Sequence, residues 1–289
     1  MIKYQENGDG IIRKVEIEVT DRGKQDLENG IQCLKKYIGE KYHDVFVEDK
    51  ENNKLVYQTE VLVPQTTKER PNLLLVIGNP AVHSVGEKMF FSYERKRKNT
   101  IWVEHRFWKA LRDCSVLVFP GNIERPSPEN IKRINTEKQT YLLNGDYKSE
   151  FNIFILPYFS FPTPASGPYS GVAGIRKILG DEIFEEMKKF EFQRFRDILL
   201  RNHIRDVICF QKSNVRKEIL AQTKPKQIKP ITVDQSRYEV YMINNTLGGV
   251  ALYTAPPTKL LHIEMFKEIL KHIVARIKAG ANVHASEPL

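Results

Sequence analysis

An asparagine stands two residues after the longest purely aliphatic run of the chain. Residues 73–77 are continuously apolar, and Gly78, Asn79 and Pro80 follow them. Such a run predicts a strand covered on both faces, and ligands of open parallel sheets bind beyond the carboxyl ends of such strands. The Asn79 amide there could orient a water molecule through its carbonyl oxygen, or recognise an amide group of a ligand by hydrogen bonding. The alternative is a simple turn that ends the strand, because Asn-Pro is a frequent turn sequence.

A basic and aromatic stretch follows this asparagine. Residues 86–112 hold eight basic and three acidic side chains, interspersed with Phe90, Phe91, Phe107 and Trp108. Basic groups pair with phosphates, and aromatic rings near them can stack on nucleobases. The alternative is a solvated loop followed by a core helix, in which Phe107 and Trp108 pack inward.

Two later segments carry groups suited to binding an anion. Lys212 and Ser213 stand where a helix is expected to begin, and the free backbone amides of a helix start can hold a phosphate. The rigid turn around Pro256 and Pro257 leads through Lys259 into the last helix. The alternative for the first of these segments is a solvated basic surface.

The motifs of several other enzyme classes are missing from the sequence. It contains no P-loop, no G-x-G-x-x-G after a strand, no H-E-x-x-H and no G-x-S-x-G. The three cysteines, Cys33, Cys114 and Cys209, are scattered without a C-x-x-C, which disfavours a zinc ribbon or an iron–sulfur cluster. We therefore expect no metal and no other cofactor.

Apolar strands alternate with amphipathic helices from residue 73 onward, which predicts a three-layer α/β/α sandwich around a mostly parallel sheet of about four to five strands. Residues 222–236 contain two prolines and little periodicity, and are expected to form a loop. The last helix is predicted from an apolar stripe between Leu260 and Ile277, with Thr258 as its cap. The other strands are expected at residues 115–119, 152–156, 206–210 and 250–253, and the other helices near 103–112, 129–143, 181–202 and 213–221.

The chain of 289 residues suits one large domain or two small ones, at roughly 150 residues per domain. Residues 14–63 predict a strand–helix–strand unit, and residues 66–72 read as a polar connector. We therefore divide the chain into an N-terminal decoration, residues 1–70, packed on a main α/β domain, residues 71–289.

The order of these motifs resembles that of the uracil-DNA glycosylase superfamily. In its mismatch-specific branch, a strand ends in Gly-x-Asn-Pro, a glycine-containing loop ends in a phenylalanine, and a helix opens with Arg-Phe-Trp-Lys. This chain has Ile-Gly-Asn-Pro at 77–80, a loop at 86–91 and Arg-Phe-Trp-Lys at 106–109, in the same order. Residues 205–212 and 254–262 are similar to the superfamily's late strand and second motif, so the resemblance spans residues 71–279.

The resemblance implies a role for each matching residue. Asn79 would position the attacking water, Phe91 would stack on the extruded base, and His262 matches a histidine that trails the second motif. Ala255 stands where most active branches have His or Asn. The catalytic residues implied are Asn79 and His262. The base-binding residues implied are Gly78, Pro80, Phe90, Phe91, Pro157 and Tyr158. The DNA-binding residues implied are Ala255, Pro256, Pro257, Thr258, Lys259, Lys212 and Ser213.

The resemblance thus implies a uracil-DNA glycosylase-like fold and a DNA glycosylase that flips a damaged or mismatched base and hydrolyses its N-glycosidic bond. A net charge of +9 favours a polyanionic partner such as DNA. We expect a monomer of the cytoplasm or nucleus, because no run is long enough for a membrane span and the sparse, odd cysteines suit a reducing compartment. Two other interpretations stay open: a nucleic-acid-binding protein of this fold without the chemistry, and an α/β enzyme acting on a small nucleotide-like substrate.

Overall fold

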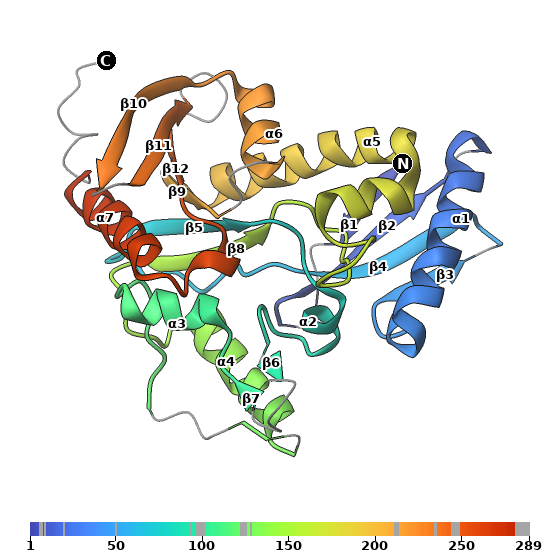
Figure 1. Cartoon of the computed structure of the whole chain (residues 1–289), viewed down its shortest axis with the longest axis horizontal. Coiled ribbons are helices and arrows are strands. Elements are labelled where there is room, and N and C mark those ends of the chain that lie inside the picture. Colours follow the sequence, from blue (N-terminus) through green and yellow to red (C-terminus); the bar gives the residue numbers. More distant parts are fainter. Residues whose placement is uncertain are drawn as a thin grey trace.

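Within its described residues, the computed structural model contains two large β-sheets with the helices that cover them, and a short two-stranded sheet of β6 (Glu94–Arg95) and β7 (Trp102–Val103) (Figure 1). It describes residues 1–5, 8, 10–19, 21–49, 51–92, 94–95, 102–121, 126–127, 129–210, 214–233, 236–243 and 249–280. One continuous cluster of buried apolar side chains runs from the N-terminal sheet into the main sheet.

The main sheet has six strands in the order β10-β11-β12-β9-β5-β8. The four strands from β12 to β8 are parallel, whereas β10 and β11 form an antiparallel hairpin at one edge. The strands are β5 (Asn72–Ile77), β8 (Asn152–Pro157), β9 (Asp206–Cys209), β10 (Lys226–Val233), β11 (Ser236–Ile243) and β12 (Val250–Thr254). The β5 and β8 interiors are almost wholly buried, as their continuous apolar runs require.

Helices lie on both faces of this sheet. Figure 1 shows α3 and α4 on one side, and α5 and α6 on the other. The helices are α3 (Arg106–Asp113), α4 (Ile131–Asn144), α5 (Gly171–Arg201), α6 (Asn214–Thr223) and α7 (Glu264–Gly280). The prediction of a mixed α/β fold, with a mostly parallel sheet flanked by helices, is therefore confirmed.

The loop predicted for residues 222–236 is wrong, because most of this segment forms β10. Among the strands that the structure describes, β10 pairs only with β11, and its register shifts between Ile228 and Ile231. Pro230, which has no amide hydrogen, is tolerated at such an irregularity in an edge strand. The shift also breaks the alternation that would have identified the strand from the sequence.

The strand predicted for residues 115–119 is also wrong. Only one isolated bridge forms there, between Val118 and Lys148. The amides of Val116 and Leu117 instead donate to the Leu111 carbonyl, at 2.8 and 3.3 Å, and so close the end of α3. These amides are consequently not available to a sheet.

The last helix starts later than predicted. Thr258 does not cap it but begins a separate 3₁₀ turn, η2 (Thr258–Leu260), in which the Leu260 amide donates to the Pro257 carbonyl at 2.8 Å. Helix α7 then begins at Glu264. The fixed backbone angles of the two prolines favour this tight turn before the helix.

The N-terminal unit is a four-stranded antiparallel sheet of order β1-β2-β4-β3 with one long helix. Helix α1 packs against α5 so closely that a Cβ on Gly30 would lie 2.0 Å from the Ile178 carbonyl oxygen. A bridge between Leu62 and Ile155 joins the unit to β8. Its elements are β1 (Ile2–Gln5), β2 (Ile12–Glu18), α1 (Asp21–Ile38), η1 (Gly39–Tyr42), β3 (Phe46–Asp49) and β4 (Lys54–Glu60). The strand–helix–strand elements expected here are present, and the domain division near residue 70 stays a prediction.

Glu60, the last residue of β4, generates a prediction about the pH dependence of stability. Its side chain is buried and forms no ion pair with any described residue, and burial raises the pKa of its carboxyl well above the ordinary value. The neutral carboxyl thus favours folding at low pH, and this contribution is lost as the pH rises above about 4.5. We expect Glu60→Gln to stabilise the protein relative to wild type more at pH 9 than at pH 5. Urea unfolding at both pH values measures this difference, and an equal difference at both would contradict it.

Candidate functional site

The carboxyl ends of the parallel strands form one edge that carries several residues singled out from the sequence. The amide of Phe159 donates to the Gly78 carbonyl at 3.0 Å, and that of Ala255 to the Cys209 carbonyl at 2.8 Å, so the segments after β5, β8, β9 and β12 lie along this edge. In the sheet, β8 lies on one side of β5 and β9 on the other, so the order of the strands reverses direction at β5. Such a reversal is where open α/β sheets bind ligands. Asn79 therefore follows the strand at the switch point.

The Asn79 side chain is held in one orientation. Its Nδ2 donates to the Thr163 hydroxyl at 2.8 Å, to the Pro80 carbonyl at 3.0 Å and, more weakly, to the Phe161 carbonyl at 3.5 Å. Carbonyl oxygens only accept hydrogen bonds, so these contacts fix which end of the amide is nitrogen. Within the described residues, Oδ1 accepts no hydrogen bond, and the residue is partly exposed. An acceptor is thus available beyond the carboxyl end of β5.

Thr163 links this amide to the start of α5. Its hydroxyl is almost completely buried, and accepts from Asn79 Nδ2 and from the Gly171 amide at 3.0 Å. Its backbone pairs with the β5 exit, because its amide donates to the Pro80 carbonyl at 3.0 Å and its carbonyl accepts from Val82 at 2.9 Å. Thr163 therefore holds both the backbone and the side chain of the Asn79 turn.

A buried ion pair supports the loop that contains Thr163. Glu191 and Arg194, on α5, bond through Oε2 and Nε at 2.7 Å. Arg194 also donates to the Tyr158 carbonyl at 2.9 Å, while Glu191 accepts from the amide and hydroxyl of Ser160. Burial raises the pKa of Glu191, although the Arg194 charge opposes this shift. The pair thus fixes the chain immediately after β8.

Phe90 and Phe91 have different environments. Phe90 is fully buried, and its carbonyl accepts from the Trp108 indole at 2.9 Å. Phe91 is partly exposed. Its backbone φ is positive, at 46°, a conformation that residues other than glycine adopt when the surrounding structure imposes it. Its ring stacks on His105 at 4.7 Å and packs on Phe107 at 4.4 Å. Of these two phenylalanines, only Phe91 is partly exposed, and its ring stacks on the His105 imidazole.

His105 caps α3 as a neutral side chain. Its Nδ1 accepts from the Phe107 amide at 3.1 Å, which assigns the ring proton to Nε2. Burial, with smaller contributions from Arg106 and His83, lowers the pKa of His105 to about 3. The imidazole is therefore uncharged at physiological pH.

The turn after β12 lies on the same edge of the sheet. Ala255 and Pro256 are buried, whereas Lys259 is exposed. Arg106, at the start of α3, donates to the Lys259 carbonyl at 2.7 Å, and His262 Nδ1 lies 3.0 Å from the same oxygen. These contacts join α3 to η2 across 153 residues of sequence. The exposed His262 and the turn are thus positioned together.

Several predicted site residues have a different environment from the one expected. The Tyr158 ring is completely buried between Phe159 and Phe195, so in this conformation it does not line an open pocket. The Pro157 carbonyl is engaged by Arg194. The assignments of Pro157, Tyr158 and Phe90 as base contacts stay predictions, and in this conformation all three residues are buried by strand and core packing. Gly78 and Pro80 are buried and shape the turn, while Lys212 and Ser213 lie outside the described residues.

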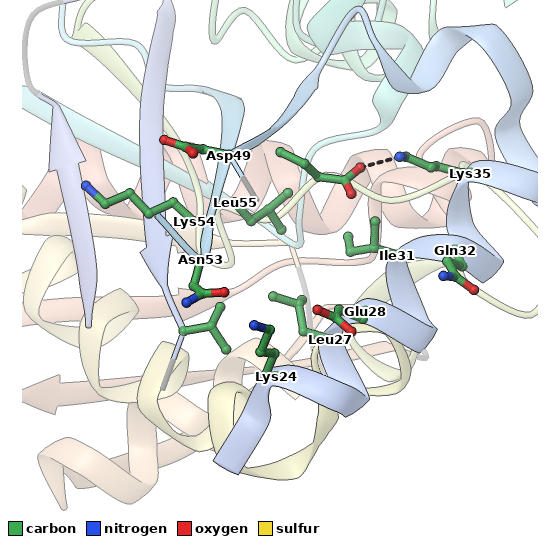
Figure 2. Close-up of a pocket in the computed structure, with 12 residues that line it drawn as sticks. Lys24, Leu27, Glu28, Ile31, Gln32, Lys35, Asp49, Asn53, Lys54 and Leu55 are labelled. Atoms are coloured by element: carbon green, nitrogen blue, oxygen red, sulfur yellow. Dashed lines mark ion pairs between the residues drawn. The ribbon is translucent and has the colours of Figure 1, made fainter. Parts of the chain in front are cut away.

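A separate cavity of about 440 Å³ lies in the N-terminal unit, between α1 and the hairpin of β3 and β4 (Figure 2). Figure 2 shows Leu27, Ile31 and Leu55 as apolar groups in this cavity, among charged side chains. It contains none of the residues at the carboxyl edge of the main sheet. The sequence analysis did not identify this site, because its residues come from three elements and form no motif.

No protein-family model matches the chain, and no curated protein matches it significantly. Within the described part of the chain, no three His, Cys, Asp or Glu side chains are grouped to hold a metal ion. Nor does any described helix combine the length and apolar composition needed to cross a membrane.

The double role of the Thr163 hydroxyl generates a prediction. Thr163→Val leaves Asn79 Nδ2 and the Gly171 amide with one acceptor fewer, which should lower the free energy of unfolding by about 1–3 kcal/mol. Thr163→Ser keeps the hydroxyl and should retain most of the stability. Thr140→Val, at an exposed helical site, is the matched control and should change stability by less than about 0.5 kcal/mol. Equal unfolding free energies for the valine and serine variants of Thr163 would contradict the assignment.

The neutral cap of α3 predicts how stability changes in acid. Because the pKa of His105 is lower in the folded protein than in the unfolded chain, its contribution is complete above about pH 6.5 and decreases as the pH falls toward 3. His105→Asn keeps a capping oxygen but does not titrate. Between pH 6 and pH 4, we expect wild type to lose about 1.4 kcal/mol more per pH unit than the variant. Chemical denaturation across this range tests the expectation, and parallel curves would rule it out.

Proposed function

We propose that this protein is a DNA glycosylase of the uracil-DNA glycosylase type, which hydrolyses the N-glycosidic bond of a damaged or mismatched base. The observation that carries the proposal is the Asn79 amide, fixed beyond the switch-point strand with its carbonyl oxygen available. That oxygen accepts a hydrogen bond from a water molecule and so orients the water toward the sugar.

The chemistry suits an amide of fixed orientation. A base in a duplex is reached only after it leaves the stack, and its release requires a water on one face of the sugar and stabilisation of charge on the departing base. Asn79 is neutral and is not a base, so its contribution is positional and electrostatic. The anchoring of Nδ2 by Thr163 and Pro80 reduces the reorganisation needed during the reaction.

The groups that would contact DNA lie at the same edge. Lys259 is exposed beside Arg106 and His262, and the chain carries a net charge of +9. Cations in this position neutralise phosphates on either side of a flipped nucleotide. Phe91 offers an aromatic ring near them, and a base could stack on it once His105 moves aside.

Charge that develops on the departing base requires a hydrogen-bond donor. Ala255 is buried and has no polar side chain, so the turn after β12 supplies no side-chain donor at that position. His262 is exposed, and its Nδ1 lies 3.0 Å from the Lys259 carbonyl, which only accepts, so Nδ1 carries the ring proton and Nε2 donates to a ligand only when the imidazole is doubly protonated. We assign this role to His262. A DNA-binding protein of the same fold without catalysis is the alternative that the buried alanine favours.

The proposal is tested with oligonucleotides that contain uracil, hypoxanthine, xanthine or a thymine mismatch, followed by detection of alkali-labile sites. Wild type should release at least one of these bases. Asn79→Ala should lower the rate by about a hundredfold or more while DNA binding is retained. Lys259→Glu should instead weaken binding to all sequences alike and reduce its salt dependence.

Two outcomes would separate the alternatives. Salt-dependent DNA binding without any abasic product would identify a non-catalytic binding protein. If neither DNA binding nor an abasic product is detected, the result favours an enzyme that acts on small nucleotide-like substrates. If base release occurs and His262→Ala leaves its rate unchanged, the donor assignment is wrong and the electrostatic contribution around Asn79 remains.

A further inference from the structure

The cavity of the N-terminal unit has an apolar floor and a charged rim. Leu27, Ile31 and Leu55 are each at least 94% buried and line its floor, next to Val19. Its volume of about 440 Å³ is in the range that holds small ligands, about 300–1,000 Å³. In Figure 2, the floor residues of α1 face Leu55 across the gap.

The charges on the rim are balanced. Three basic and three acidic side chains line the cavity: Lys24, Lys35, Lys54, Glu28, Glu48 and Asp49. A balanced rim provides no net attraction for a ligand of high charge, such as a nucleotide or an oligonucleotide phosphate. It suits a ligand that carries both signs of charge.

Most of these charged groups already have partners within the protein. Lys35 pairs with Glu48, whose Oε1 also accepts from the Tyr42 hydroxyl at 2.9 Å. Lys54 pairs with Glu16 at 3.1 Å. Asp49 accepts from the amide and the side chain of Asn52, at 3.1 and 2.8 Å. These groups are therefore not available to neutralise a ligand.

Lys24 and Glu28 are different. Neither forms an ion pair or a side-chain hydrogen bond with any described residue, although they are one helical turn apart on α1. Lys24 is partly buried, whereas Glu28 is exposed. Figure 2 shows both side chains at the cavity, beside Leu27. One unpaired cation and one unpaired anion thus flank the apolar floor.

We propose that this cavity binds a free α-amino acid with an aliphatic or aromatic side chain. The ligand carboxylate pairs with Lys24, its ammonium pairs with Glu28, and its side chain lies on Leu27, Ile31 and Leu55. The juxtaposition of two unpaired opposite charges and an apolar floor matches the three parts of such a molecule. This inference is independent of the chemistry proposed at Asn79.

The test is isothermal titration of the full-length protein with L-leucine and L-phenylalanine. Two leucine analogues separate the charges: 4-methylpentanoate lacks the amine, and 3-methylbutylamine lacks the carboxylate. At least one amino acid should bind saturably, and each leucine analogue should bind about three- to tenfold more weakly than leucine. If phenylalanine alone binds, 3-phenylpropanoate and 2-phenylethylamine replace the leucine analogues.

Variants assign the contacts. Lys24→Met keeps the side-chain stem and removes the cation, while Glu28→Gln removes the anion. Each variant should bind the amino acid about three- to tenfold more weakly than wild type. Lys36→Met is the matched control, because Lys36 is exposed on the same helix and does not line the cavity. Unchanged melting temperatures would show that the variants are folded.

Three results would overturn the proposal. The first is that neither amino acid binds saturably. The second is that an analogue lacking one charge binds as tightly as the amino acid. The third is that Lys36→Met loses as much affinity as the Lys24 and Glu28 variants. None of these results bears on base release, so this inference and the proposed glycosylase activity fail separately.

Discussion

The buried pair of Glu191 and Arg194 organises the chain at the point where β8 ends. Both side chains are buried; Arg194 Nη2 donates to the carbonyls of Pro157 and Tyr158, and Glu191 Oε1 accepts from the amide and hydroxyl of Ser160. Removing one partner would leave the other charged in the interior, which is strongly unfavourable. The pair therefore determines where the following loop begins. That loop brings Thr163 to the β5 exit, and Thr163 in turn holds the Asn79 amide. The orientation of one polar group at the sheet edge thus depends on an ion pair on a helix behind the sheet.

The sequence contained the information for the elements whose pattern is local. The continuous apolar run before Asn79 identified β5, and parallel pairing then placed the β12 turn on the same edge, as the order of strands and helices implied. Strand β10 was missed because a register shift and a proline interrupt its alternation. Residues 115–119 were misread because an apolar segment that closes a helix resembles a short buried strand.

The side-chain contacts of the site were less accessible to sequence reasoning. Thr163 lies 84 residues from Asn79, and no spacing rule connects them. The Glu191 and Arg194 pair left no distinctive trace in the sequence, because other charged residues, such as Lys189 and Asp197, surround it on the same helix. Phe91 was identified as an accessible aromatic, but its stacking on His105 depends on the positive φ at Phe91 and on the cap of α3. Tertiary packing alone determines these features.

The two edges of the main sheet are protected from association in different ways. On one side, the backbone of Leu62 forms an antiparallel bridge to Ile155 and covers part of β8. On the other side, β10 has only one neighbour, but the register shift between Ile228 and Ile231 and the missing amide hydrogen of Pro230 interrupt its free edge. An uninterrupted edge would offer a template for a strand of a second molecule, and bulges and prolines are devices that prevent this. The irregularity that hid β10 in the sequence therefore also disfavours growth of the sheet from one molecule into the next, and helps to keep a crowded solution of this protein free of β-aggregates.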